Sequence, residues 1–113
     1  MANFMVLYEM PVGGLEEWMK KPEAERKPEE DSLKAEWDAW LAAHAGSVLS
    51  TVGVGKAKRV SAGGAEDASN GIMLSSYAQA ESAEAAADLF RDHPHLKIPG
   101  ATIEIMEVKP LKA

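Results

Sequence analysis

Apolar residues divide the chain into segments that alternate between strand-like and helix-like patterns. Residues 3–10 (NFMVLYEM) are short, apolar and rich in strand-forming types, and Pro11 with the glycines that follow ends them. Because nearly every position here is apolar, we expect both faces of this strand to be covered. Residues 15–20 are long enough for one or two helical turns.

The clearest pattern is the helical stripe of residues 29–44. Its apolar positions recur at steps of four, three, one and three and so share one face. They are Leu33, Trp37, Trp40, Leu41 and His44. Gly46 stands where a glycine commonly follows a helix. We expect Pro28 in the first helical turn and the mostly charged residues 21–30 to form an exposed loop or a frayed lead-in.

The second half of the chain predicts two more strands, a helix and a final strand. Residues 47–52 read as a strand that continues through 56–60 after a glycine-bearing irregularity, and 62–70 (AGGAEDASN) read as a loop. Residues 71–78 form the next strand. Ser82 is a good N-cap for a short helix that ends near Arg91 or Asp92, before Pro94. Residues 102–109 alternate as a strand.

This order, β-α-β-β-α-β, predicts a single α+β domain over residues 1–113 with the ferredoxin-like plan. Right-handed crossovers give the antiparallel strand order 102–109, 3–10, 71–78, 47–52, with both helices on one face. In the last strand, Ile103 and Ile105 would face the helices, which leaves Glu104 and Met106 on the open face. An open face with that much apolar area should be covered, and a second copy of the sheet is the simplest cover.

Composition narrows the function classes. The 113 residues are 46% hydrophobic and 27% charged, as in a folded domain, and they include no cysteine, which fits a reducing, cytoplasmic setting. The N-terminus lacks the features of a signal peptide, and no apolar run reaches the roughly 20 residues of a membrane span. A formal net charge of −6 disfavours binding to nucleic acid or anionic membranes.

Several short motifs, in this order, resemble the YCII-related proteins (the DGPF-type group), which have the dimeric α/β-barrel fold. The likeness covers nearly the whole chain. Its pieces are residues 4–8 (FMVLY), 37–40 (WDAW), 55–56 (GK), 60–61 (VS), 71–72 (GI), 93–96 (HPHL) and 100–105 (GATIEI). The resemblance implies the fold, a homodimer and a small-molecule cleft, but little about the reaction.

One feature of that family does not carry over. Some relatives are thought to use a histidine on the first helix with an aspartate directly before the proline that follows the second helix. Here residues 34–37 of the first helix hold no histidine, and His93 rather than Asp92 precedes Pro94. Catalysis by that couple is therefore in doubt for this chain.

The segment Asp92-His93-Pro94-His95 is the main candidate for chemistry. Histidine titrates near neutral pH and a carboxylate can orient it, so Asp92, His93 and His95 could transfer protons. The alternative is structural, because histidine suits the last turn of a helix and proline ends it. No third metal ligand is identifiable. The topology places these residues at the same end of the sheet as Met10 and Trp18, with His44 at the other end.

Ligand contacts are predicted from three more residues. Trp18 lies in a weakly patterned segment at the end that should form the cleft, so it could line a site or cover it. Tyr8 belongs to the central first strand, and Glu104 points into the space between paired sheets if its strand has the expected phase. The other tryptophans, Trp37 and Trp40, fit the core better.

Two functions follow as hypotheses. In the first, a homodimer binds a small organic molecule near Trp18 and the two histidines, and could catalyse isomerisation or hydrolysis by proton transfer without a cofactor. In the second, the chain is a non-catalytic accessory or interaction module. An enclosed pocket with converging histidine and carboxylate groups would favour the first, whereas solvated histidines would favour the second.

Overall fold

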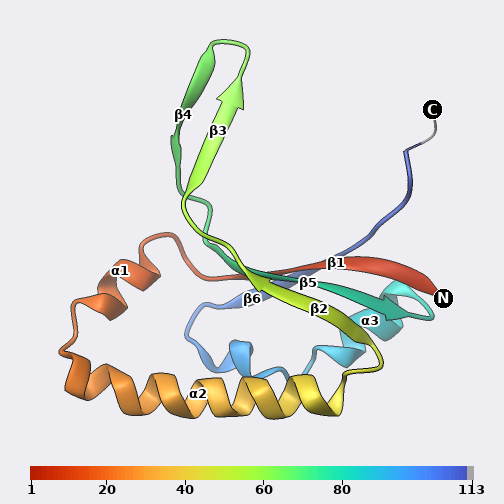
Figure 1. Cartoon of the computed structure of the whole chain (residues 1–113), viewed down its shortest axis with the longest axis horizontal. Coiled ribbons are helices and arrows are strands. Elements are labelled where there is room, and N and C mark those ends of the chain that lie inside the picture. Colours follow the sequence, from red (N-terminus) through yellow and green to blue (C-terminus); the bar gives the residue numbers. More distant parts are fainter. Residues whose placement is uncertain (112–113) are drawn as a thin grey trace.

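The structure is a computed structural model, and it describes residues 1–111. Its centre is a four-stranded antiparallel sheet with helices on one side and a separate hairpin projecting on the other (Figure 1). The strands are β1 (Ala2–Glu9), β2 (Val48–Gly53), β3 (Ala57–Ser61), β4 (Gly64–Ala68), β5 (Ile72–Ala80) and β6 (Thr102–Glu107). The helices are α1 (Gly14–Met19), α2 (Glu23–Ala43), α3 (Ala83–Leu89) and the 3-10 helix η1 (Pro94–Lys97).

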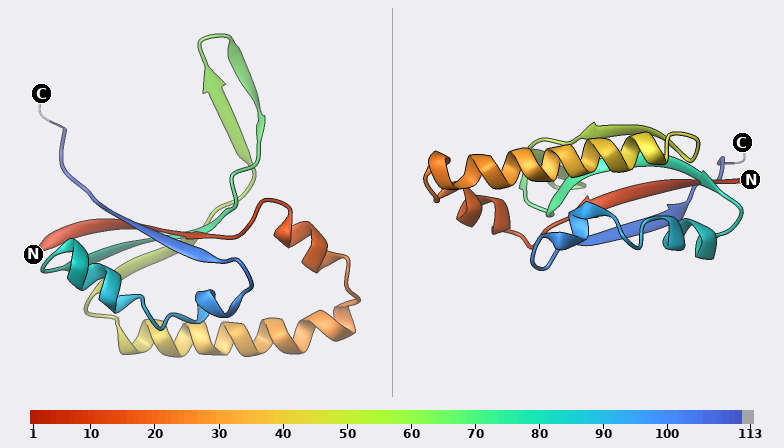
Figure 2. Two further views of the ribbon diagram at one scale, coloured as in Figure 1. Left: turned by 180° about the vertical axis from the view of Figure 1, so that it is seen from behind. Right: turned by 90° about the horizontal axis from the view of Figure 1, so that it is seen from below.

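The sheet confirms the predicted fold class and strand order. Its strands run β2-β5-β1-β6, with β1 between β5 and β6 and antiparallel to both. Seen from below, α2 lies along one side of the helical layer and α3 with η1 along the other (Figure 2). The arrangement is ferredoxin-like. No helix among residues 1–111 is both long and apolar enough to cross a membrane.

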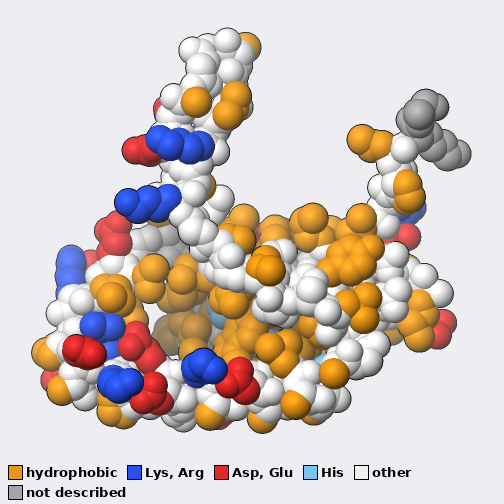
Figure 3. All heavy atoms as spheres, in the orientation of Figure 1, with side chains coloured by type: hydrophobic (Ala, Val, Ile, Leu, Met, Phe, Trp, Pro, Cys, Tyr) orange, Lys and Arg blue, Asp and Glu red, His pale blue; other side chains and the backbone are white. Residues whose placement is uncertain are grey.

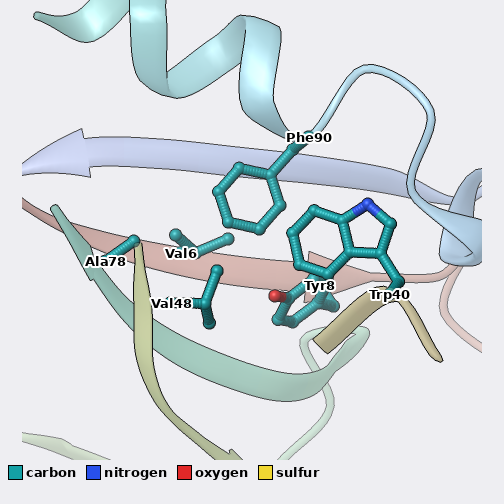
Figure 4. Close-up of a cluster of buried hydrophobic side chains, with 6 residues drawn as sticks. All are labelled: Val6, Tyr8, Trp40, Val48, Ala78 and Phe90. Carbon is teal, nitrogen blue, oxygen red and sulfur yellow. The ribbon is translucent and has the colours of Figure 1, made fainter. Parts of the chain in front are cut away.

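The core lies between the sheet and the helices. Phe4, Val6 and Tyr8 alternate along β1 and are buried on the helical side. Trp40 of α2 and Phe90 after α3 pack over Val6 and Tyr8 (Figure 4). Full burial of side chains of this size contributes about 1.5 to 3 kcal/mol each relative to exposure. The expectation that Trp40 belongs to the core is therefore confirmed.

The opposite face of the sheet is open and partly apolar. Met5 is 45% exposed, Tyr77 37% and Met106 40%. Ile103 and Ile105 are half-buried on the helical side, whereas Glu104 and Met106 are exposed. The predicted phase of the last strand is thus confirmed, and the one face of the sheet that the chain does not cover carries large apolar side chains.

The loop predicted over residues 62–70 is wrong, because residues 64–68 form strand β4. It pairs with β3 in an isolated two-stranded hairpin, so β3 is also not a continuation of β2. Ion pairs join Lys58 to Asp67 and Arg59 to Glu66 across the two strands. Cross-strand charge pairs of this kind replace the apolar alternation by which strands are usually recognised. Gly64 adopts φ +135°, which suits glycine in the tight turn.

The long helix begins earlier than predicted. It starts at Glu23, so the charged segment is helical and Pro28 lies inside the helix. Ion pairs one turn apart, Arg26–Glu30 and Lys27–Asp31, support this half of the helix. The short helix α3 begins as predicted, because the Ser82 hydroxyl accepts a hydrogen bond from the backbone of Ala85.

Candidate functional site

A groove of about 880 Å³ separates α1 from the first half of α2. Figure 3 shows it as a hollow between the helices and the sheet, with hydrophobic and histidine atoms on its floor. Its wall is mainly apolar, with carboxylates and two lysines at the rim. The lining residues used below are Met10, Trp18, Glu30, Ser32, Leu33 and Ile98.

The outer wall of the groove is α1. Gly13 takes φ +87° and lets the chain turn into this helix directly after the end of β1. Trp18 is half-buried and donates a hydrogen bond from Nε1 to Glu30 Oε2 of α2 at 2.8 Å. The structure thus places Trp18 at the groove, where it was predicted to be, and ties α1 to α2 through it.

Glycines allow strands to meet closely beside the groove. A Cβ atom on Gly71 would stand 2.3 Å from the carbonyl oxygen of Met10, and Gly71 has φ +76°. The Met10 amide donates to the Gly71 carbonyl at 2.8 Å. Any other residue at position 71 would push β5 away from the end of β1, on which the groove and the histidines depend.

The two predicted histidines are buried near each other, with ring centroids 6.5 Å apart. His93 Nδ1 accepts a hydrogen bond from the backbone amide of His95 at 2.9 Å. His95 Nε2 lies 2.9 Å from the carbonyl oxygen of Glu9, so it is the donor in that bond. These bonds select the tautomers of the neutral rings: His93 carries its proton on Nε2, and His95 keeps Nδ1 as its basic nitrogen.

Burial keeps both rings uncharged at neutral pH. His93 is 1% exposed and His95 2%. Burial, with the neighbouring His95, lowers the pKa of His93 to about 4, although the carboxylate of Asp92 opposes the shift. Burial also lowers the pKa of His95, against the opposing hydrogen bonds to the carbonyl groups of Glu9 and Thr102.

Aromatic rings enclose His93. Its ring centroid is 4.3 Å from that of Trp37, 4.4 Å from Trp40 and 5.1 Å from Tyr8. Within residues 1–111, its Nε2 atom is buried and has no hydrogen-bond partner, and the same holds for Trp40 Nε1. Buried polar atoms are usually paired, so a free donor here is a feature that needs an explanation.

A chain of hydroxyl groups extends from the same cluster toward the edge of the sheet. The Tyr8 hydroxyl lies 2.8 Å from Ser76 Oγ, which lies 2.7 Å from Thr51 Oγ1. Burial raises the pKa of Tyr8, and the hydrogen bond to Ser76 opposes that shift. Tyr8 was a predicted ligand contact. Ser76 and Thr51 were missed, although the alternation of β5 already placed Ser76 on the same face as Ala78.

Glu104 is separated from the other candidates by the sheet. It lies on the open face, where Glu9 is its diagonal neighbour across β1 and β6. A hydrogen bond between the carboxyl groups of Glu9 and Glu104, which can form only when one of the two is protonated, raises the pKa of Glu9, and partial burial and the charge of Glu104 add to the shift. Glu104 therefore cannot share a site with Trp18 and Tyr8 in one chain.

Asp92 and His44 complete the account of the predicted residues. Asp92 is exposed, and within residues 1–111 no hydrogen bond joins it to either buried histidine. His44 was expected far from the site, yet its ring stacks on Trp40 at 4.0 Å, and Trp40 contacts His93. In the described part of the chain, no group of three or more potential ligands could hold a metal ion.

Comparison with known proteins adds support for the fold alone. No protein-family model and no curated protein sequence matches the chain. Among solved structures, it is similar to 5-chloro-2-hydroxyhydroquinone dehydrochlorinase from Burkholderia phenoliruptrix in complex with 2,5-dihydroxybenzoquinone. The TM-score is 0.56 over 96% of this chain and 94% of that one, with 11% sequence identity.

Proposed function

We propose that this protein binds a small, mainly apolar organic molecule in the groove beside α1 and moves protons on it through the two buried histidines. The observation that carries the proposal is the free Nε2 donor of His93. The histidine segment adjoins the groove along the chain, because Glu9, whose carbonyl binds His95, precedes the lining residue Met10, and the lining residue Ile98 follows η1.

The tautomers suggest different roles for the two histidines. His93, uncharged with its proton on Nε2, would donate a hydrogen bond to an oxygen atom of the ligand. His95, with a basic Nδ1, would accept a proton from it. Isomerisation without a cofactor needs only this pair of actions, with the proton taken up by His95 returned at another atom of the ligand, whereas hydrolysis would also need a water molecule as the nucleophile. The proposal assigns Asp92 no proton transfer, because it is exposed and, within residues 1–111, makes no hydrogen bond to either ring.

The similar dehydrochlorinase supplies a probe for this proposal. Its structure holds 2,5-dihydroxybenzoquinone, a flat ring with carbonyl and hydroxyl oxygens that would suit an apolar groove with a buried donor. Binding should raise the melting temperature of the protein, since a ligand that binds only the folded state stabilises it. Exchange of the ring C–H hydrogens with D₂O, followed by NMR, would report proton transfer at carbon.

Matched variants make the test specific. Ser32→Trp would fill the groove, whereas Lys34→Trp adds the same ring on the exposed side of α2. We expect the probe to raise the melting temperature of wild type and Lys34→Trp but not of Ser32→Trp. In His95→Gln, we expect slower exchange of the ring C–H hydrogens of the probe with D₂O. If neither the probe nor related phenols raise the melting temperature of the wild-type protein, or if they raise that of Ser32→Trp by the same amount, the groove is not the binding site.

A second candidate function is favoured by the open sheet face. Its apolar side chains and the projecting hairpin suit a protein–protein contact, and we propose that a second copy of the chain covers them in a two-fold dimer. Without ligand binding, this contact would be the function of an accessory or interaction module.

A further inference from the structure

The β3–β4 hairpin is the part of the chain with the least support from its own fold. Its strands pair with each other and not with the main sheet. Figure 1 shows it standing clear of the helices and the sheet. Most of its side chains are exposed, and Val60 is 79% exposed. An isolated two-stranded hairpin is marginal in water, so contact with a surface outside this chain would stabilise it.

The direction of the hairpin indicates which surface that is. Figure 1 and the left view of Figure 2 show the hairpin and residues 108–111, which follow β6, rising from the side of the sheet opposite the helices. Between them, hydrophobic atoms line the sheet (Figure 3). The two projections therefore flank the open face, which holds Met5, Tyr77 and Met106.

The base of the hairpin is continuous with that face. A hollow of about 380 Å³ joins Leu7 of β1 and Ser75 of β5 to Lys56 and Ala57 at the start of the hairpin. A molecule that covers the open face would therefore also meet the hairpin.

The length of the hairpin indicates how far it would reach. Strands of five residues extend for about 17 Å, whereas two sheets that pack face to face lie about 10 Å apart. The hairpin is therefore longer than the gap, and its tip would pass beside the second sheet. Near that tip, Val60 pairs with Ala65, and the charged pairs lie closer to the base. The tip of the hairpin thus offers an apolar contact.

We infer that the β3–β4 hairpin is an intermolecular arm, and that its partner is the second copy of this chain that covers the open face. The inference rests on the dimer proposed above and goes beyond it, because each copy would hold the other outside the paired sheets. The hairpin would then be ordered by the partner rather than by its own fold.

The absence of cysteine allows a direct test in mixed dimers. A nitroxide spin label on Val60→Cys would be mixed with unlabelled ¹⁵N chain, so that any signal loss in the ¹⁵N chain comes from the other copy's arm. We expect a contiguous set of amides to lose intensity. A label on Ala42→Cys, on the exposed side of α2, should leave those amides unchanged.

A second variant keeps the inference falsifiable if labelling disturbs the arm. Val60→Asp should weaken dimerisation about tenfold in sedimentation equilibrium, and Ala42→Asp should not. If dimers form but the ¹⁵N chain shows no signal loss, or if Val60→Asp dimerises with the same affinity as wild type, the role of the hairpin as an arm is overturned but the dimer is not. A monomer at every concentration would overturn both, whereas ligand binding in the groove, tested by the Ser32→Trp pair, would stand or fall separately.

Discussion

The two faces of the sheet are built from the same strands but differ in burial. On the helical face, Phe4, Val6 and Tyr8 meet the aromatic side chains of α2 and the segment after α3, and all are buried. On the other face, Met5 and Met106 remain 45% and 40% exposed, and a carboxyl pair stands beside them. The apolar side chains of the first face are buried by other parts of the same chain. The second leaves large apolar side chains exposed, which is the basis for the dimer proposed above.

The largest expected difference is in the free energy of unfolding, which should fall much more for a substitution on the helical face than for one on the open face. Phe90→Ala removes a buried ring and should lower the free energy of unfolding by about 3 kcal/mol or more. Met5→Ala, on the open face, should cost a monomer less than about 1 kcal/mol and instead weaken association. Urea unfolding over a range of protein concentrations distinguishes these losses. Equal costs for both variants in a monomeric sample would contradict the comparison.

The buried histidines should make the helical face sensitive to acid. The pKa of His93 is about 4 in the folded chain and about 6.5 in the unfolded chain. The free energy of unfolding therefore carries no penalty from this residue at pH 7, and it decreases as the pH falls below 6.5, because the unfolded chain binds the proton first. The loss from this residue is on the order of 3 kcal/mol once the pH is below 4. His93→Gln should unfold with a weaker pH dependence. An equal slope in wild type and variant would show that the ring is not buried neutral.

The carboxyl pair should give the open face the opposite response. The pKa of Glu9 is raised in the folded chain, so its ionisation costs stability above that pKa and costs nothing below the unfolded value. Glu9→Gln should raise the melting temperature by about 1 to 3 °C at pH 7.5 and leave it unchanged at pH 3.5. Glu107→Gln, on the same strand as Glu104, is the matched control. A lower melting temperature at pH 7.5 would contradict the pairing.

The smallest effect on stability is expected at the groove. Trp18→Ala removes one exposed hydrogen bond to Glu30 and should change the free energy of unfolding by less than about 0.5 kcal/mol. It should nevertheless weaken binding of 2,5-dihydroxybenzoquinone in the thermal-shift assay, because Trp18 lines the groove. Retained binding would leave α1 without a role in the site.

Much of the fold could be predicted because its periods are strong. The stripe through Leu33, Trp37 and Trp40 and the alternation of Ile103 and Ile105 predicted which sides of α2 and β6 face the core. The hairpin could not be predicted in the same way. Small residues and glycines occupy its turn and much of β4, and cross-strand charge pairs such as Lys58–Asp67 only become visible once the register is known.

The positions of the candidate residues in the fold were predictable, but their surroundings were not. The topology brought His93, His95 and Trp18 to one end of the sheet, and the structure agrees. The sequence could not reveal that both rings are buried, since their burial depends on contacts with Tyr8 and Trp37, far away in the chain. The sequence placed Glu104 on the open face, but it could not assign the face of Tyr8, because nearly every position of residues 3–10 is apolar.

The central claim is that His93 is a buried, neutral imidazole with a free Nε2–H donor. Long-range ¹H–¹⁵N NMR of the three histidine side chains, recorded from pH 8 to the acid limit of folding, tests it most directly. We predict that His93 shows one tautomer, with its proton on Nε2, and stays neutral until the pH approaches about 4. A His93 ring that titrates near pH 6.5 with both tautomers populated would contradict the account.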